Sequence, residues 1–271
     1  MAKIGKFRLS GRMVRFGLYG VLAMLLMGFA AAFWLWQHLY AGMPPLPSKD
    51  ALWETGREQA YEFRDHEGDL ITIRGPHYGR VVQINELAPH VAQAFIAAED
   101  KRFFEHDGAD TTAILRAAWA NWRSGRTVSG ASTITQQLIK NLVLGPEQTV
   151  RRKVQEVRLA RQLETQLSKD EILTLYLNRI YFGSGAYGID AATEEYFGKR
   201  PTELTLGEAA LLATLPKAPS RLALDTNLEA ARERQLYVLS QMVDANFITE
   251  AQKVDAYEAS VTLVEASASA V

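Results

Sequence analysis

A long apolar stretch opens the hydrophobic pattern of the chain. From Phe16 to Trp36 there is no charged residue, and a helix rising about 1.5 Å per residue crosses a hydrocarbon core roughly 30 Å thick with such a stretch. The pattern therefore predicts a transmembrane helix over residues 16–38. A cleaved signal peptide is the alternative, because the small residues Ala30 to Ala32 follow a shorter apolar stretch.

The charges on the two sides of this segment predict its orientation. Residues 1–15 carry several basic side chains and no acidic one, whereas the residues that follow the segment are mixed in sign. By the positive-inside rule, the N-terminus lies in the cytoplasm and the rest of the chain outside it. We therefore expect a single-pass membrane protein with a basic cytoplasmic segment over 1–15.

The pattern becomes proline-rich after the apolar segment and then alternates. Residues 39–60 form the predicted linker, in which Pro44, Pro45 and Pro47 cannot continue a helix. Over residues 61–74, apolar and polar positions alternate around Gly68, which predicts a small β-hairpin.

From about residue 85 the apolar positions follow helical spacing. Polar residues that can cap a helix precede several of these apolar runs. The expected helices are 111–123 after the N-cap Asp110, two that begin at Ser168-x-x-Glu171 and Thr205-x-x-Glu208, and longer ones at 150–167 and 227–246. Residues 124–132 are small and polar with two glycines, so they are a candidate mobile loop. Residues 259–271 are expected to form a flexible tail. We expect a mainly α domain over 61–258 with one small strand element.

Composition narrows the class of protein. A chain of 271 residues that is 48% hydrophobic and 23% charged suits one globular domain with an appendage. The formal net charge of -1 gives no field that attracts nucleic acid, so we expect no nucleic-acid partner. Cysteine is absent, which excludes disulfides and thiolate catalysis, and the five histidines show no metal-ligand spacing.

Two acidic residues occupy a position where chemistry is plausible. Glu99 and Asp100 follow an apolar run and precede a polar segment, and such surroundings can raise the pKa of a carboxyl group and make it a useful base. A surface carboxylate that caps a helix or pairs with Lys101 or Arg102 explains the same pattern. The pattern alone leaves both interpretations open.

Two polar clusters follow along the chain. The first crowds hydrogen-bonding groups that suit a polyhydroxylated ligand, although a polar helix surface tolerates them too; its members are Ser132, Thr133, Thr135, Gln136, Gln137, Lys140 and Asn141. In the second, Arg152 and Glu156 share a helix face with Lys153 beside them. An ordinary i, i+4 salt bridge explains this spacing, and so does a basic cluster that receives a diphosphate together with Lys140.

In order along the chain, five motifs resemble those of peptidoglycan glycosyltransferases, glycosyltransferase family 51. They are Glu99-Asp100-x-x-Phe103-x-x-His106-x-Gly108, Gly130-x-Ser132-Thr133-x-Thr135-Gln136-Gln137-x-x-Lys140-Asn141, Arg152-Lys153-x-x-Glu156, a block from Lys169 to Lys199, and a block from Glu208 to Pro219. The resemblance covers about residues 80–245.

This resemblance implies a mainly α fold with a lysozyme-like head lobe and a smaller, membrane-facing jaw lobe that includes Trp119 and Trp122. It also implies the bacterial inner membrane as the location, with the catalytic domain on the periplasmic or extracytoplasmic side. The implied partners are lipid II, the growing glycan chain and the bilayer. Transpeptidases and proteins of the division or elongation machinery are further candidates.

The implied reaction polymerises lipid II into β-1,4-linked glycan with inversion at the anomeric carbon and release of polyprenyl diphosphate. Glu99 matches the general base. Glu156 matches a second carboxylate, which either holds the cations in place or helps to bind a divalent cation, Mg²⁺ or Mn²⁺, over the diphosphate; no organic cofactor is implied. The residues implied in substrate binding are Asp100, Ser132, Thr133, Gln136, Gln137, Lys140, Asn141, Arg152 and Lys153.

Two departures and three alternatives qualify this picture. Gln148 stands where members often carry an arginine, and residues 221–225 lack the usual tyrosine and proline pair. One alternative is a lytic transglycosylase, but that enzyme has no use for a basic diphosphate site. Another is an inactive scaffold, which would not need the carboxylates Glu99 and Glu156. Neither Ser-x-x-Lys nor Lys-Thr-Gly occurs, so we expect no transpeptidase activity, whether the chain is naturally monofunctional or part of a bifunctional enzyme.

Overall fold

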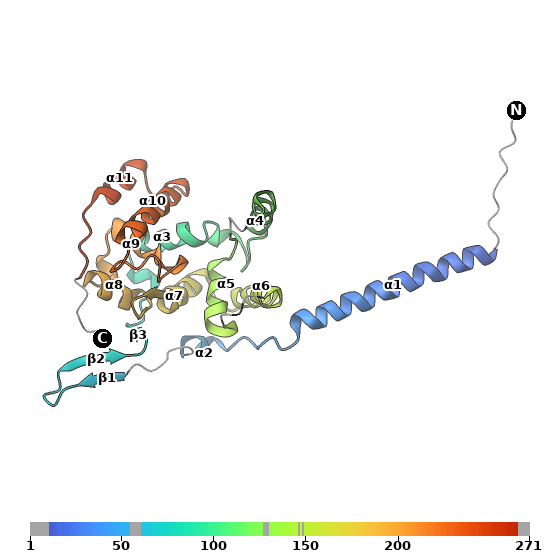
Figure 1. Cartoon of the computed structure of the whole chain (residues 1–271), viewed down its shortest axis with the longest axis horizontal. Coiled ribbons are helices and arrows are strands. Elements are labelled where there is room, and N and C mark those ends of the chain that lie inside the picture. Colours follow the sequence, from blue (N-terminus) through green and yellow to red (C-terminus); the bar gives the residue numbers. More distant parts are fainter. Residues whose placement is uncertain (1–10, 55–60, 127–129, 146, 148, 265–271) are drawn as a thin grey trace. The chain divides into compact units, whose positions relative to one another are not determined.

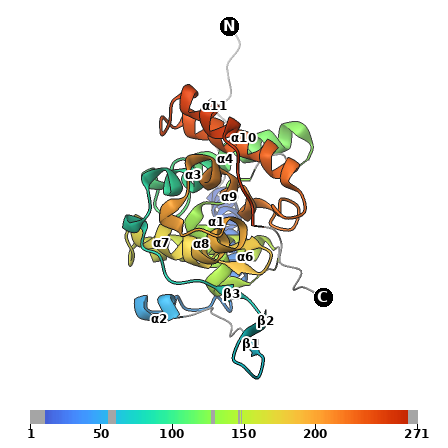
Figure 2. The same ribbon diagram turned by 90° about the vertical axis from the view of Figure 1, so that its left-hand side faces the viewer.

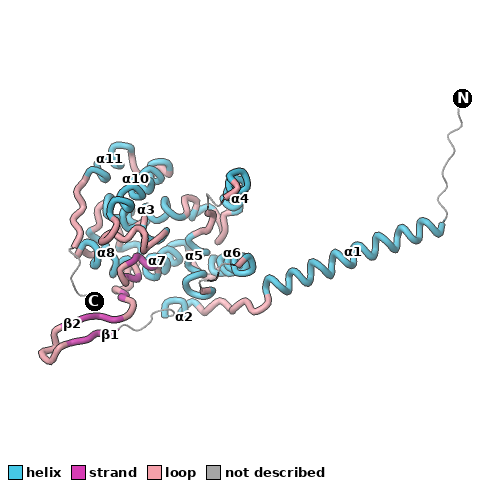
Figure 3. Tube along the Cα trace, in the orientation of Figure 1, coloured by secondary structure: helices cyan, strands magenta, loops and turns pink. Residues whose placement is uncertain are grey.

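The computed structural model describes residues 11–54, 61–126, 130–145, 147 and 149–264 (Figure 1). Over these residues the chain is mainly helical, which confirms the predicted fold class (Figure 3). The helices are α1 (Gly11–Tyr40), α2 (Lys49–Glu54), α3 (Pro89–Glu99), α4 (Thr111–Ser124), α5 (Ile134–Ile139), α6 (Val150–Glu164), α7 (Lys169–Arg179), α8 (Ile189–Phe197), α9 (Leu206–Leu212), α10 (Leu228–Asp244) and α11 (Glu250–Glu258). Short helical turns are η1 (Ile84–Glu86), η2 (Phe103–Glu105), η3 (Lys140–Leu144), η4 (Pro201–Glu203) and η5 (Leu215–Lys217).

The chain divides into two compact units. One contains residues 1–44 and 148–155, and the other contains residues 45–147 and 156–271. In the first unit, α1 extends beyond both predicted ends of the apolar helix and is long and apolar enough to cross a membrane. Gln155 Nε2 donates to the Leu39 carbonyl at 3.0 Å, so the last turn of α1 is tied to the start of α6.

The predicted linker contains a helix that the sequence pattern did not indicate. The chain is irregular through the prolines, as expected, and then forms α2, whose Leu52 is fully buried. Lys49 Nζ lies 2.5 Å from Glu171 Oε1 on α7, and Arg179 Nη2 donates to the Leu52 carbonyl at 3.3 Å. These contacts dock α2 onto α7 within the second unit.

The strands form two small sheets. Strands β1 (Tyr61–Arg64) and β2 (Leu70–Arg74) are antiparallel, which confirms the predicted hairpin. The second sheet has the order β3-β5-β4, with β3 (His77–Tyr78) parallel to β5 (Ala186–Tyr187) and β4 (Tyr181–Gly183) antiparallel to it. The sequence pattern did not predict this sheet.

Side chains that cap helices begin several of them where the sequence predicted. Asp110 accepts a hydrogen bond from Ala113 N at the start of α4, and both predicted capping boxes are present at α7 and α9. Helix α6 ends at Glu164, three residues short of the predicted Leu167. The candidate loop and the tail include residues 127–129 and 265–271, which lie outside the described part of the chain.

The core of the second unit surrounds α3. This helix packs against α9 and α10, while α11 lies against α10 (Figure 2). On the other side of the core, α5 packs on α7 and α8 covers the three-stranded sheet. Phe95 of α3 meets Phe182 of β4 edge to face, with ring centroids 5.8 Å apart. The C-terminal end of α3 is thereby fixed among helices that are distant in sequence.

Candidate active site

Glu99 is the last residue of α3, whose apolar side chains lie in the core. Val91 and Phe95 are fully buried, and the helix ends where Asp100 leaves the helical conformation, with φ near -159° and ψ near 72°. Glu99 therefore lies where the core meets the following polar segment, as predicted. Its Oε2 accepts a hydrogen bond from Gln137 Nε2 at 2.7 Å.

The surroundings of the Glu99 carboxylate increase its affinity for a proton. Burial raises the pKa of Glu99, and this effect outweighs the hydrogen bond from Gln137, which lowers the pKa. The positive charges of Lys217 and Arg234 also lower it, whereas the negative charge of Asp100 raises it. A carboxyl group with a raised pKa is suited to take a proton from a hydroxyl group.

A cleft of about 530 Å³ opens beside Glu99. The end of α3, helix α4, the residues just before α5, and helix α10 line it. Among the predicted binding residues, Asp100, Ser132 and Thr133 are part of this lining, and α10 adds Tyr237 and Gln241. The volume is in the range of pockets that hold a small ligand or part of a larger one.

The cations nearest to Glu99 in sequence have other partners. Lys101 Nζ lies 3.3 Å from Asp244 Oδ2, and Arg102 Nε lies 2.7 Å from Glu105 Oε2. The interpretation of Glu99 as a surface carboxylate paired with Lys101 or Arg102 is therefore wrong.

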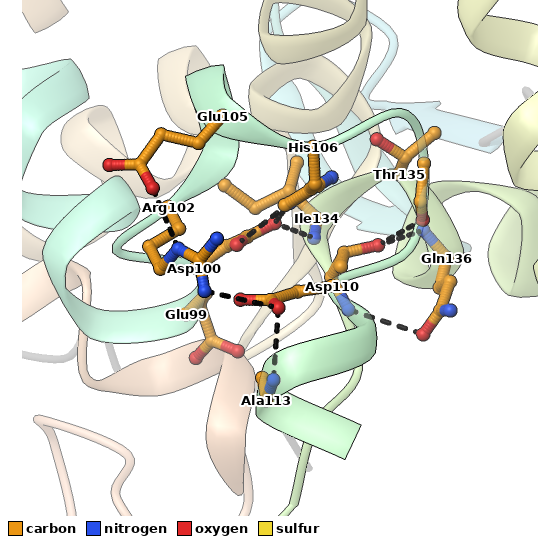
Figure 4. A network of polar contacts seen from close by, with 12 residues as sticks. Glu99, Asp100, Arg102, Glu105, His106, Asp110, Ala113, Ile134, Thr135 and Gln136 are labelled. Atoms are coloured by element: carbon orange, nitrogen blue, oxygen red, sulfur yellow. Dashed lines mark hydrogen bonds and ion pairs between the residues drawn. The ribbon is translucent and has the colours of Figure 1, made fainter. Parts of the chain in front are cut away.

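Asp100 joins the segment after α3 to the start of α5 (Figure 4). Its Oδ2 accepts a hydrogen bond from Ile134 N at 3.0 Å, and His106 Nε2 lies 3.0 and 3.1 Å from its two oxygens. The carboxylate can only accept, so His106 Nε2 carries the proton and donates it. Asp100 thus holds the wall of the cleft together with His106, to which the sequence assigned no chemical role. The binding of substrate by Asp100 stays a prediction.

The polar residues at the start of α5 have different surroundings. Thr133 Oγ1 donates to the Gly108 carbonyl at 2.7 Å, which ties α5 to the end of the first motif. Gln136 is fully buried, and its Oε1 accepts from Thr133 N in a capping box. Ser132 is exposed on the cleft, whereas Gln137 reaches Glu99. The predicted strip therefore divides into residues that face the cleft and residues that support it.

The remaining predicted residues lie on η3 and α6. Lys140 and Asn141 are exposed at the start of η3. Arg152 and Lys153 are near the start of α6, within the unit that contains α1, and Glu156 is buried one turn further along that helix. Their assembly around a diphosphate stays a prediction. Gln148, the departure at the usual arginine position, lies outside the described residues.

Comparison with known proteins decides the family of the chain. The family described as "Transglycosylase" matches residues 67–243, which contain Glu99 and the residues that line its cleft. The chain belongs to the transglycosylase family. The five motifs of the sequence thus indicated the correct family.

Relatives of this transglycosylase are longer proteins. Penicillin-binding protein 1A of Aquifex aeolicus (strain VF5) is 45% identical over 218 residues, which are 80% of this chain and 30% of that protein. Penicillin-binding protein 1A of Escherichia coli (strain K12) is 41% identical over 241 residues, 89% of this chain and 28% of that protein. The chain thus spans less than a third of the length of these relatives.

A solved structure of the same kind also matches. The crystal structure of penicillin-binding protein 1A from Haemophilus influenzae has a TM-score of 0.48 and 24% sequence identity, and the match covers 78% of this chain and 22% of that one.

Several residues near Glu99 of this transglycosylase were missed by sequence reasoning. Lys217 lies within the fifth motif, so its position carried a signal that went unused. Arg234 and Tyr237 belong to α10, which the sequence predicted as a helix without assigning it any site residue. Tyr176 lies in the fourth motif and is fully buried. The motif gave no sign of its hydrogen bond to Gln137.

Proposed function

We propose that this transglycosylase polymerises lipid II into β-1,4-linked glycan strands and that Glu99 is its general base. The observation that carries the proposal is the Glu99 carboxylate on the wall of a cleft of about 530 Å³, with a raised pKa caused by burial. A sugar hydroxyl is a weak nucleophile until a base removes its proton, and Glu99 is suited to that task.

In the proposed reaction, the 4-hydroxyl oxygen of the acceptor disaccharide attacks the anomeric carbon of the donor chain. The bond from that carbon to the diphosphate oxygen breaks, the proton of the hydroxyl passes to Glu99, and the configuration at the carbon inverts. The departing polyprenyl diphosphate carries the electron pair of the broken bond and requires no proton. Its charge needs cations, which we assign to Lys140, Arg152 and Lys153.

A divalent cation over the diphosphate is part of the proposal. Mg²⁺ in phosphate-transfer sites commonly uses one or two carboxylates together with substrate oxygens and water, and Glu156 supplies one buried carboxylate near those cations in sequence. Among the described residues, the group of three carboxylates close enough together to share an ion is Asp65, Glu67 and Asp69 in the hairpin turn. There Asp65 Oδ1 already accepts from the backbone of Glu67 and Asp69, which explains the group as a turn.

The membrane is the proposed setting of the reaction. We assign α1 as a single-pass span with its N-terminus in the cytoplasm and the cleft outside, on the side where lipid-linked precursor is polymerised. On α4, Leu115, Trp119 and Trp122 are exposed and spaced along one face, which suits contact with lipid. Transpeptidases and proteins of the division or elongation machinery are the proposed protein partners.

The direct test is polymerisation of purified lipid II by the full chain in detergent or vesicles, with the glycan strands resolved on a gel. Wild type is expected to form polymer and Glu99→Gln none. Glu250→Gln is the matched control, because Glu250 is an exposed carboxylate on α11 that pairs with Lys253. Equal polymer from wild type and Glu99→Gln would remove Glu99 as the base.

The same experiment separates the proposal from its alternatives. Preformed glycan that becomes shorter would identify a lytic transglycosylase, which breaks the linkage instead of forming it. Binding of lipid II without any new glycan would identify a scaffold. Cross-linked peptides in the product would contradict the expectation that the chain has no transpeptidase activity.

A further inference from the structure

Tyr176 has a buried hydroxyl that the proposed reaction does not use. Its side chain is fully buried, and the residues of α7 from Ile172 to Arg179 are all buried. The hydroxyl donates to Gln137 Oε1 at 3.4 Å, and Gln137 Nε2 in turn donates to Glu99 Oε2 at 2.7 Å. Three helices, α7, α5 and α3, thus contribute one residue each to a chain of hydrogen bonds that ends on the carboxylate.

The donors and acceptors in this chain allow one arrangement when Glu99 is ionised. A carboxylate only accepts hydrogen bonds, so the amide nitrogen of Gln137 must face it. The amide oxygen then faces Tyr176, whose hydroxyl must donate. Burial and the nearby carboxylates raise the pKa of Tyr176 well above its ordinary value, so the hydroxyl keeps its proton throughout the neutral range.

We propose that Tyr176 is a positioning residue that fixes the amide of Gln137 with its N–H toward Glu99 and thereby favours the ionised form of the base. The proposal rests on the proposed function, because it takes Glu99 as the base. Tyr176 itself is too deeply buried to touch substrate in the cleft. It acts through Gln137, whose amide donates a hydrogen bond to the Glu99 carboxylate.

Loss of the Tyr176 hydroxyl has a defined consequence. Without this donor the amide of Gln137 is free to rotate, and the rotated amide places its oxygen against the carboxylate. The ionised form of Glu99 then loses a hydrogen bond, while the charges of Asp100, Lys217 and Arg234 around it are unchanged. The pKa of Glu99 therefore rises, and the base is protonated at a higher pH than in the wild type.

The test is the pH dependence of lipid II polymerisation by the full chain. The acid limb of kcat/KM reports the base of the free enzyme. In Tyr176→Phe we expect this limb to move to higher pH by about half a unit to one unit, the equivalent of one neutral hydrogen bond. At pH values above this acid limb, the KM of Tyr176→Phe should stay within about twofold of the wild-type KM, because no substrate contact is removed.

Tyr196→Phe is the matched control. Tyr196 is also a buried tyrosine, and its hydroxyl donates to the Phe182 carbonyl at 3.0 Å in a different part of the domain. It should show the wild-type acid limb. Thermal melting of both variants checks folding. If Tyr176→Phe does not fold, Tyr176→Met, which also lacks the hydroxyl, carries the test, with an upward shift of the acid limb again expected.

A double variant separates action through Gln137 from a general effect on structure. In the Gln137→Leu background there is no amide to orient, so adding Tyr176→Phe should leave the acid limb where Gln137→Leu alone places it. A further shift there, or a wild-type limb in Tyr176→Phe, would overturn the role of Tyr176. Glu99→Gln in the same assay tests the base on its own, so the two failures are distinguishable.

Discussion

Gly108 closes the first motif, and both its backbone and its neighbours require glycine. Its φ is +79°, and a Cβ at this position would lie 2.6 Å from Ala160 C and from Arg161 N of α6. A non-glycine residue in this conformation costs about 1–2 kcal/mol. Moving a packed helix backbone away from the new methyl group costs about 1–3 kcal/mol more. We therefore expect Gly108→Ala to lower the free energy of unfolding by about 2–5 kcal/mol, a large share of the 5–15 kcal/mol typical of a domain.

Gly125→Ala isolates the backbone part of this cost. Gly125 has a similar φ of +65° at the end of α4, and nothing lies within 4 Å of a Cβ built there. It should lose only about 1–2 kcal/mol. Urea unfolding of both variants in the same detergent, followed by circular dichroism, measures the two values. Equal losses would refute the argument that Gly108 is required by its close approach to α6.

Three further predictions concern charged and polar residues of the same domain. The pKa of Glu99 is raised in the folded state, so the wild type loses stability as pH rises through that pKa. The melting temperature of Glu99→Gln should therefore equal that of the wild type in acid and exceed that of the wild type at neutral pH. Lys169→Met removes the cation 2.8 Å from Glu164, whose side chain is 6% exposed, and should cost about 2–4 kcal/mol in urea unfolding. A loss below about 1 kcal/mol would show that this pair contributes little. Asp110→Ala removes the N-cap of α4 and should cost about 1 kcal/mol, most of which Asp110→Asn should recover in the same measurement.

Local rules were sufficient for the parts of the fold in which neighbouring residues determine the structure. Asp110, Ser168 and Thr205 each cap a helix that begins at the predicted residue, because a cap needs only a side-chain oxygen and the next few backbone N–H groups. The hairpin was predicted for the same reason. By contrast, β3 and β5 are two-residue strands paired across a long stretch of sequence, and strands this short show no period.

The candidate site was predictable as a set of motifs but not as a geometry. Gln136 and Gln137 are adjacent and identical in type, yet one is buried at the start of α5 and the other bonds to Glu99. Successive residues of a helix point about 100° apart, so their roles depend on how α5 is turned against α3 and α7. That rotation is set by packing on α7, which no local pattern in the sequence encodes.

The adjacent carboxylates Glu99 and Asp100 illustrate how the end of a helix separates two roles. Asp100 leaves the helical conformation, and its oxygens are occupied by His106 and by Ile134 N. Glu99 keeps the helical conformation at the edge of the core and accepts, among the described residues, a hydrogen bond from Gln137 alone. Two carboxyl groups in different environments take different tasks. A base must offer an oxygen to substrate. Of these two carboxylates, only Glu99 retains an oxygen without a hydrogen bond to a described residue. The termination of α3 after Glu99 therefore separates the proposed base from Asp100, which supports the wall of the cleft.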